Sequence, residues 1–220
     1  MLQITCANEP GASLKLLCLG AHSDDIEIGC CGTILQLIRA YKNVEFFWVV
    51  LGANDKERRQ EAIRSAELLL EGVAKKTIVV KAFEDTCFPF AGKEIKNYFQ
   101  EIKASYQPDL IFTHYRHDLH QDHRIVCEFT WNTFRDQLIL EYEVPKYDGD
   151  VGTPNFFSPI DDSTAQEKIS HLMANFRTQR SKPWFTEETF RALLCLRGIE
   201  SGGLERYAEA FYCRKLLCQW

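Results

Sequence analysis

Short apolar runs alternate with helical stripes of apolar residues along most of this chain, and this alternation restricts the fold more than any other feature. Apolar runs occur near residues 15–19, 44–51, 77–81 and 109–113, and the run at 44–51 is rich in β-branched and aromatic residues. After each run, apolar residues recur at helical spacing, as Ile95, Phe99 and Ile102 do behind the third. Strands that alternate with helices predict a parallel sheet with helices on both faces. We therefore expect a doubly wound, Rossmann-type α/β fold with a mostly parallel sheet.

The C-terminal third continues the pattern less regularly. Residues 138–147 predict a fifth strand, and a Pro-containing loop is expected near residues 151–161. Helical stripes over 164–177 and 187–197 precede a closing segment at 197–211. With 220 residues and little change in composition along the chain, residues 1–220 are expected to form a single domain, with residues 1–13 loosely ordered.

Charge and cysteine usage exclude several classes of protein. The formal net charge is -5 and there is no long Lys/Arg run, which argues against nucleic-acid binding and favours a small-molecule ligand. The first residues lack the pattern of an export signal, and no long apolar stretch predicts membrane insertion. Nine cysteines without a C-x-x-C pair are typical of a reducing compartment, so a cytoplasmic location is expected.

Two polar clusters follow predicted strands. The first lies in residues 20–32, GAHSDDIEIGCCG, and the second in residues 114–124, HYRHDLHQDHR. In open α/β sheets, ligands bind outside the carboxyl ends of strands where the strand order reverses. If the order reverses between the first and fourth strands, both clusters border one crevice, and we predict one site there.

The residue types in these clusters fit metal-assisted hydrolysis. His22 lies three residues before Asp25, and His120 lies three residues before His123, so short turns can direct these groups at one point. Two imidazoles and one carboxylate with an open position suit a hydrolytic Zn²⁺, although the same donors also admit other divalent metals. Two groups remain for a base and a hydrogen-bond donor, Asp24 and His120, although spacing alone does not separate Asp24 from Asp25. This set predicts amide hydrolysis.

Two motifs resemble those of the PIG-L or LmbE-like zinc deacetylases, which remove acetyl groups from N-acetylglucosamine-type sugars. The motif A-H-P-D-D is represented by residues 21–25, AHSDD, and H-x-D-H by residues 120–123, HQDH. The resemblance implies an LmbE-like fold with one Zn²⁺ per chain. It also implies that the metal ligands are His22, Asp25 and His123, that Asp24 is the general base, and that His120 is the oxyanion donor or acid.

The likeness extends to EYEVP, PNFFSPID, RG and YAEAF, which are similar to a bacterial branch linked to sugar and cell-surface biosynthesis. It implies pocket roles for Arg197 and Glu209. Arg58 opens the helix after the second strand, where it can bind sugar hydroxyls or phosphate or remain on a solvated face. Ser23, Ile26 and Cys31 depart from the family pattern, but none removes a ligand or the base.

Several residues keep two interpretations. Asp122 is predicted to act in catalysis by fixing the tautomer of an imidazole, and Asp118 can do the same. His114 and His117 are expected in a loop or behind the ligands, and Cys30 and Cys31 are expected to pack in the core. A basic spot at Arg177, Arg180 and Lys182 can meet a nucleotide diphosphate, but a surface charge run is favoured.

The sequence therefore predicts a zinc-dependent hydrolase that deacetylates an acetamido sugar, either free or attached to a nucleotide or other carrier. Two alternatives remain open: the same chemistry on an N-formyl group or an acylated non-sugar amine, and a sugar-binding protein without activity. The expected partner is the small-molecule sugar or its conjugate, without nucleic acid, and the sequence leaves the oligomeric state open.

Overall fold

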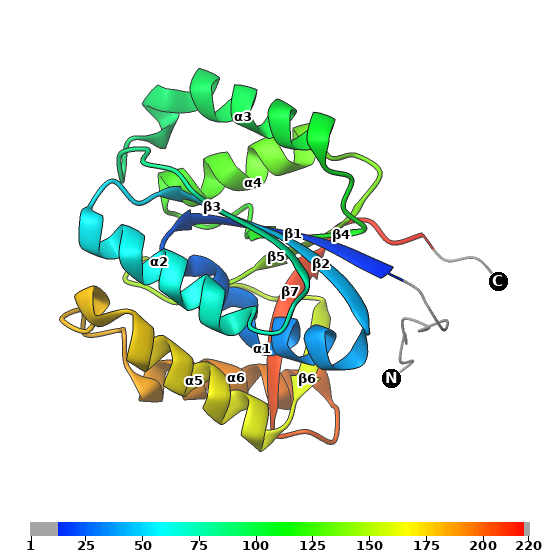
Figure 1. Ribbon diagram of the computed structural model, residues 1–220. Helices are drawn as coiled ribbons and strands as arrows, with labels where there is room; N and C mark the ends of the chain where they lie inside the picture. Colours follow the sequence, from blue (N-terminus) through cyan, green and yellow to red (C-terminus); the bar gives the residue numbers. More distant parts are fainter. Residues whose placement is uncertain (1–12, 218–220) are drawn as a thin grey trace.

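A seven-stranded sheet in the order β3-β2-β1-β4-β5-β7-β6 forms the centre of the computed structural model, which describes residues 13–217 (Figure 1). The strands are β1 (Ser13–His22), β2 (Asn43–Gly52), β3 (Lys75–Val80), β4 (Leu110–His114), β5 (Leu138–Tyr142), β6 (Phe156–Ile160) and β7 (Tyr207–Cys213). β1 to β5 pair in parallel, and β7 is antiparallel to both of its neighbours. The predicted doubly wound, mostly parallel sheet is confirmed. Residues 1–13 are predicted to be loosely ordered, and residues 1–12 of this segment lie outside the described range.

Helices cover both faces of this sheet. They are α1 (Asp25–Ala40), α2 (Lys56–Leu69), α3 (Gly92–Ser105), α4 (Gln121–Thr133), α5 (Asp162–Asn175) and α6 (Glu187–Ser201), with short 3-10 turns η1 (Phe88–Ala91) and η2 (Arg177–Gln179). In Figure 1, α3 and α4 lie above the sheet, whereas α1, α2, α5 and α6 lie below it. α5 packs against both α1 and α2.

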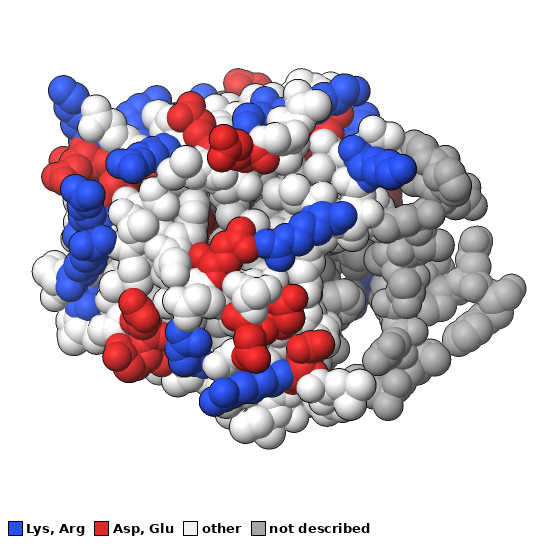
Figure 2. Space-filling model, turned by 60° about the horizontal axis from the view of Figure 1, so that its bottom comes forward, with Lys and Arg blue, Asp and Glu red and all other residues white. Residues whose placement is uncertain are grey.

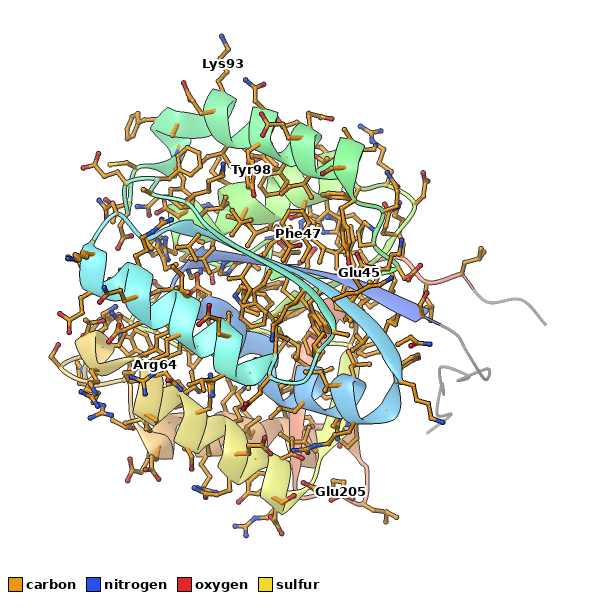
Figure 3. The ribbon with its side chains drawn as sticks, in the orientation of Figure 1. Glu45, Phe47, Arg64, Lys93, Tyr98 and Glu205 are labelled. Atoms are coloured by element: carbon orange, nitrogen blue, oxygen red, sulfur yellow. The ribbon has the colours of Figure 1, made fainter. Side chains whose placement is uncertain are left out.

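The core consists of two apolar layers separated by the sheet. Along β1, Leu16 and Cys18 face the layer between the sheet and α1. Leu17 and Leu19 face the layer between the sheet and the helices α3 and α4. This two-sided burial explains why the central strands are continuous apolar runs without polar alternation. Figure 3 shows Phe47 of β2 and Tyr98 of α3 between the sheet and α3, at the partly exposed margin of the second layer.

The strand order reverses at β1. β1 pairs with β2 on one side and with β4 on the other, with Cys18 opposite both Trp48 and Phe112. The carboxyl ends of β1 and β4 are therefore adjacent. The predicted meeting of the two polar clusters at this edge is confirmed.

Three local predictions differ from the structure. Residues 156–160 form the edge strand β6 rather than a loop, and Pro159 is accommodated because an edge strand leaves some N–H groups unpaired. β5 ends at Tyr142, so the predicted fifth strand is shorter than 138–147. In the sequence, Asn54 followed three residues later by Glu57 predicts an N-cap at Asn54. The N-cap of α2 is instead Asp55, because its carboxylate accepts the N–H groups of Glu57 and Arg58.

The surface carries charges of both signs. Figure 2 views the side covered by α5 and α6, where Lys/Arg and Asp/Glu side chains are interspersed. No helix within residues 13–217 is long and apolar enough to span a membrane.

Candidate metal and catalytic site

Three predicted metal ligands converge at the carboxyl ends of β1 and β4. His22 is the last residue of β1, Asp25 is the first of α1, and His123 lies in the first turn of α4. His22 Nδ1 lies 3.2 Å from His123 Nε2 and 3.5 Å from Asp25 Oδ2, and His123 Nε2 lies 3.6 Å from Asp25 Oδ2. All three side chains are buried.

Carboxylates behind the two histidines determine which nitrogen atoms face the centre. His22 Nε2 lies 2.8 Å from Asp85 Oδ1 and 3.1 Å from Asp122 Oδ2, and His123 Nδ1 lies 2.8 Å from Asp118 Oδ2. A nitrogen that faces a carboxylate carries the proton and donates it, so the other ring nitrogen presents a lone pair. These other nitrogens, His22 Nδ1 and His123 Nε2, are the ones that lie near Asp25 Oδ2, as metal ligation requires.

The donor spacing fits zinc. With bonds of about 2.0 to 2.1 Å, a tetrahedral zinc ion separates its ligand atoms by about 3.3 to 3.4 Å. The three separations here, 3.2, 3.5 and 3.6 Å, lie close to that value. The donors and their geometry therefore suit a metal with two nitrogen ligands and one oxygen ligand.

Asp24 lies beside this centre, and its carboxylate makes no hydrogen bond within the described residues. It occupies the N-cap position of α1, yet its side chain makes no capping hydrogen bond, and its charge partner among the described residues is Arg58, with Nη2 3.6 Å from Oδ1. Burial and the neighbouring Asp25 raise the pKa of Asp24, while Arg58 opposes the increase. A buried carboxylate with a raised pKa and no structural hydrogen bond can accept a proton from a reacting group.

His120 presents a protonated nitrogen toward the same region. Its Nδ1 accepts the backbone N–H of Asp122 at 3.2 Å, which leaves the proton on Nε2. The ring stacks on His123 with centroids 4.6 Å apart and meets the His22 ring edge-on at 4.9 Å. Burial lowers the pKa of His120, so a neutral N–H donor is the dominant form near neutral pH.

Asp122 connects the metal ligands to the loop after β3. One carboxylate oxygen accepts the backbone N–H of Thr86 at 2.7 Å and faces His22, and the other accepts the N–H of Phe88 at 3.1 Å. Thr86 has φ +66, an unfavourable conformation for a β-branched residue. These bonds hold the loop so that Asp85 reaches His22, and the His22 contact lowers the pKa of Asp85.

Arg58 reaches the site from the first turn of α2. Its guanidinium lies 3.1 Å from Asp85 Oδ2 and donates through Nε to the Ser23 hydroxyl at 3.2 Å. Ser23 occupies the position at which the resembled motif has proline, and its hydroxyl supplies a hydrogen bond that proline lacks. Arg58 is thus directed at the site rather than at solvent.

Lys146 supports the ligand loop from behind. Its ammonium lies 2.9 Å from Asp118 Oδ2, the same oxygen that receives His123 Nδ1. It also contacts Asp150, whose carboxylate accepts the Leu119 N–H at 2.7 Å. The segment after β5 therefore fixes the loop between β4 and α4.

His114 lies behind the ligands. Its Nε2 lies 2.9 Å from the Ala21 backbone N and 3.2 Å from Asp25 Oδ2, and burial lowers the pKa of His114 to about 4. Its ring stacks on His123 at 3.9 Å. His117 is exposed and stands edge-on to Tyr115.

Arg197 and Glu209 make internal contacts away from the three ligands. Arg197 donates to both carboxylate oxygens of Glu143 and to the Gly152 carbonyl. Glu209 accepts the N–H groups of Gly32 and Thr33 in α1 and pairs with Lys168. Both side chains are buried, so their predicted contact with substrate stays a prediction.

Sequence reasoning did not single out Asp85 or Lys146. Asp85 follows the carboxyl end of β3, and the rule that located the two polar clusters also applies to that strand. Lys146 carries no such signal, because its role depends on how the segment after β5 folds back onto Asp118. Cys30 and Cys31 are fully buried in the core, as expected.

The part of the chain that carries these residues matches a known family. The sequence model of the PIG-L family, described as GlcNAc-PI de-N-acetylase, matches residues 17–134, which is 118 of the 220 residues. The chain belongs to the PIG-L family. The matched region contains the second half of β1, all of β2 to β4 and α4, and all three candidate metal ligands of this PIG-L protein.

Solved structures share the PIG-L fold described above. N,N'-diacetylchitobiose deacetylase from Pyrococcus horikoshii, in complex with its inhibitor MPG, is 24% identical with a TM-score of 0.67, over 90% of this chain and 83% of that chain. The zinc-inhibited form of teicoplanin deacetylase Orf2 is 14% identical with a TM-score of 0.68, over 91% and 97%. GalB, the 4-carboxy-2-hydroxymuconate hydratase from Pseudomonas putida KT2440, is 16% identical with a TM-score of 0.73, over 94% and 98%. A hydratase among these neighbours means that the fold alone does not specify the reaction.

Proposed function

We propose that this protein is a metal-dependent N-deacetylase of acetamido sugars, which releases acetate and an amino sugar. The observation that carries the proposal is the convergence of His22 Nδ1, His123 Nε2 and Asp25 Oδ2 within 3.6 Å, with the uncommitted carboxylate of Asp24 beside them. Membership of the PIG-L family and the fold shared with two deacetylases support it.

The residues divide the chemistry as follows. Asp24 accepts a proton from the water that attacks the acetamide carbonyl, and later returns it to the departing amine. The Nε2–H of His120 donates to the carbonyl oxygen as negative charge develops there. Asp122 and Asp118 act through the tautomers of His22 and His123. The Arg58 guanidinium lies beside the Asp24 carboxylate and favours its ionised form. Arg58 is also positioned to bind a sugar hydroxyl.

His22, Asp25 and His123 would hold one divalent metal, with zinc the best fit to their donors. When bound, such a metal supplies Lewis-acid polarisation of the carbonyl and acidifies water.

Two measurements test the proposal. Metal analysis of the purified protein should find about one divalent ion per chain. A fluorescence assay for released amines, run on a panel of free, nucleotide-linked and lipid-linked acetamido sugars, should detect turnover. Asp24→Asn preserves shape but removes the base, and should lower kcat by about 10²- to 10⁴-fold. Asp136→Asn, at an exposed loop carboxylate, is the matched control and should retain activity.

The panel also separates the alternatives. Turnover restricted to N-formyl or acylated non-sugar amines would replace the sugar assignment while retaining the chemistry. Binding of acetamido sugars to the metal-loaded protein without turnover would identify a binding protein and refute the proposed activity.

A further inference from the structure

A cavity lies along the outer side of α4, and we call it the arginine groove. It encloses about 630 Å³ and is lined by Pro89, Arg116, Gln121, Arg124, Ile125, Cys127, Glu128, Trp131, Asn132, Arg135 and Arg214. This volume falls in the range of pockets that hold small molecules. None of the groups assigned above to metal binding or proton transfer lines it.

The groove concentrates positive charge on a chain that is acidic as a whole. Four arginines line it against one lining carboxylate, Glu128, whereas the chain has a net charge of -5. Arg116 and Arg135 are exposed, and neither guanidinium has a hydrogen bond or ion pair within residues 13–217. Two cationic side chains without partners on the wall of one cavity leave several N–H donors available to an anion.

The remaining two arginines are held in place. Arg214 stacks over the Trp131 ring at 4.0 Å and lies 3.7 Å from the fully buried Glu141, which also accepts the Trp131 indole N–H. Arg124 donates to the backbone carbonyls of Asp118 and Leu119. The groove therefore has a preorganised floor and two cations without partners in the described part of the chain, an arrangement that suits ligand capture.

The groove also adjoins the segments that carry the catalytic groups. Arg124 bonds the carbonyl of Asp118, the residue that orients His123. Gln121 donates to the Thr86 carbonyl, and Pro89 follows Phe88, whose N–H is bound by Asp122. A ligand in the groove would contact both loops that hold the metal ligands in position.

We propose that the arginine groove binds a small molecule that carries two or more phosphate groups. Guanidinium groups bind phosphate through paired N–H bonds. The lining runs along α4 from Gln121 to Asn132, which at 1.5 Å per residue is about 16 Å, longer than a single anionic group. The proposal stands on the groove itself and does not require that the protein be a deacetylase.

Isothermal titration of the purified, metal-loaded protein with inorganic pyrophosphate and with UDP-N-acetylglucosamine tests this directly. Both probes should bind the wild type, and binding should weaken as salt is raised. The double variant Arg116→Gln/Arg135→Gln should bind pyrophosphate at least about tenfold more weakly, since each lost charge-assisted bond is worth that much. Arg64→Gln, at an exposed arginine of α2 on the opposite side of the sheet (Figure 3), is the matched control and should bind as the wild type does.

The source of the phosphate is decided by a second comparison. If the phosphate belongs to the substrate, the double variant raises KM for a nucleotide-linked acetamido sugar but not for the free sugar. If the phosphate compound is a separate ligand, pyrophosphate and a free acetamido sugar bind together, and KM does not change. Both results support the groove as a phosphate site.

Two results would overturn the proposal. One is the absence of pyrophosphate binding by the wild type up to about 10 mM, a concentration above any functional affinity for such a site. The other is pyrophosphate binding of equal affinity by the wild type and the double variant, when both proteins unfold at the same temperature. That result would mean that pyrophosphate binds to the metal or to another surface. Loss of deacetylase activity alone would affect only the function proposed above.

Discussion

Glu27 is a buried carboxylic acid whose removal should change the pH dependence of stability. It lies in α1 with 1% of its surface exposed. Ser65 Oγ donates to its Oε1 at 2.5 Å, but its Oε2 has no hydrogen-bond partner among the described residues. Burial raises the pKa of Glu27 from 4.5 to about 8. The folded protein therefore keeps this proton at neutral pH, whereas the unfolded chain releases it.

The raised pKa makes Glu27 a destabilising group above pH 4.5. Between pH 4.5 and 8 the folded state binds more protons than the unfolded state, so the free energy of unfolding falls as pH rises. The pKa difference of 8 − 4.5 corresponds to a loss of about 5 kcal/mol once pH exceeds 8, and about 3 kcal/mol of this is already present at pH 7. Near pH 5 the loss is below about 1 kcal/mol.

Glu27→Gln removes this titration and retains an acceptor for Ser65. Urea unfolding of both proteins, followed by circular dichroism at equal metal load, should show a stability difference that grows by about 4 kcal/mol in favour of the variant from pH 5 to pH 9. Glu67→Gln, at an exposed position of α2, should follow the wild type at every pH. A Glu27→Gln difference that stays constant over this range would refute the reasoning.

Three further predictions concern the site. Asp118→Asn should weaken metal binding about 10- to 100-fold in competition with a chelator, because Asn does not replace the carboxylate that receives His123 Nδ1–H; unchanged affinity would contradict the orienting role. Ser23→Ala should raise KM more than it lowers kcat, since Arg58 loses a hydrogen bond, and an unchanged KM would show that this bond is unimportant. The pH profile of kcat/KM should fall on its acid side at a pH above the ordinary pKa of aspartate, because Asp24 must be ionised and its pKa is raised. Arg58→Gln should move that limb to higher pH, since Arg58 lowers this pKa; a shift to lower pH would exclude Asp24 as the titrating group.

Much of the fold follows from patterns that act locally along the chain. Central strands are buried on both faces, so β1 and β2 are recognisable as uninterrupted apolar runs. β6 was missed because an edge strand is only partly buried and contains Pro159, so its residues resemble a loop. The N-cap of α2 was misplaced by one residue because Asn54 and Asp55 are both good caps, and only the backbone geometry separates them.

The candidate ligands were predictable for a similar reason. Each pair, His22 with Asp25 and His120 with His123, is close in sequence. Each pair follows one of the two strands between which the strand order reverses, and the carboxyl ends of those strands are adjacent. Two contacts that support these groups were not predictable. The Lys146 contact with Asp118 joins a segment that precedes α4 in the sequence to one that follows it. The Thr86 contact with Asp122 depends on a left-handed backbone conformation that the residue type does not predict.

The separation in sequence between the metal ligands and the residues that brace them has a consequence for synthesis on the ribosome. All three ligands have been translated by residue 123, whereas Glu209, which holds α1 through Gly32 and Thr33, is translated 86 residues later. At about 5 to 20 residues per second this delay lasts about 4 to 17 s. During that interval the growing chain contains all three candidate metal ligands but not the strand that fixes the helix bearing Asp25. Stable metal uptake should therefore follow, rather than guide, completion of the sheet.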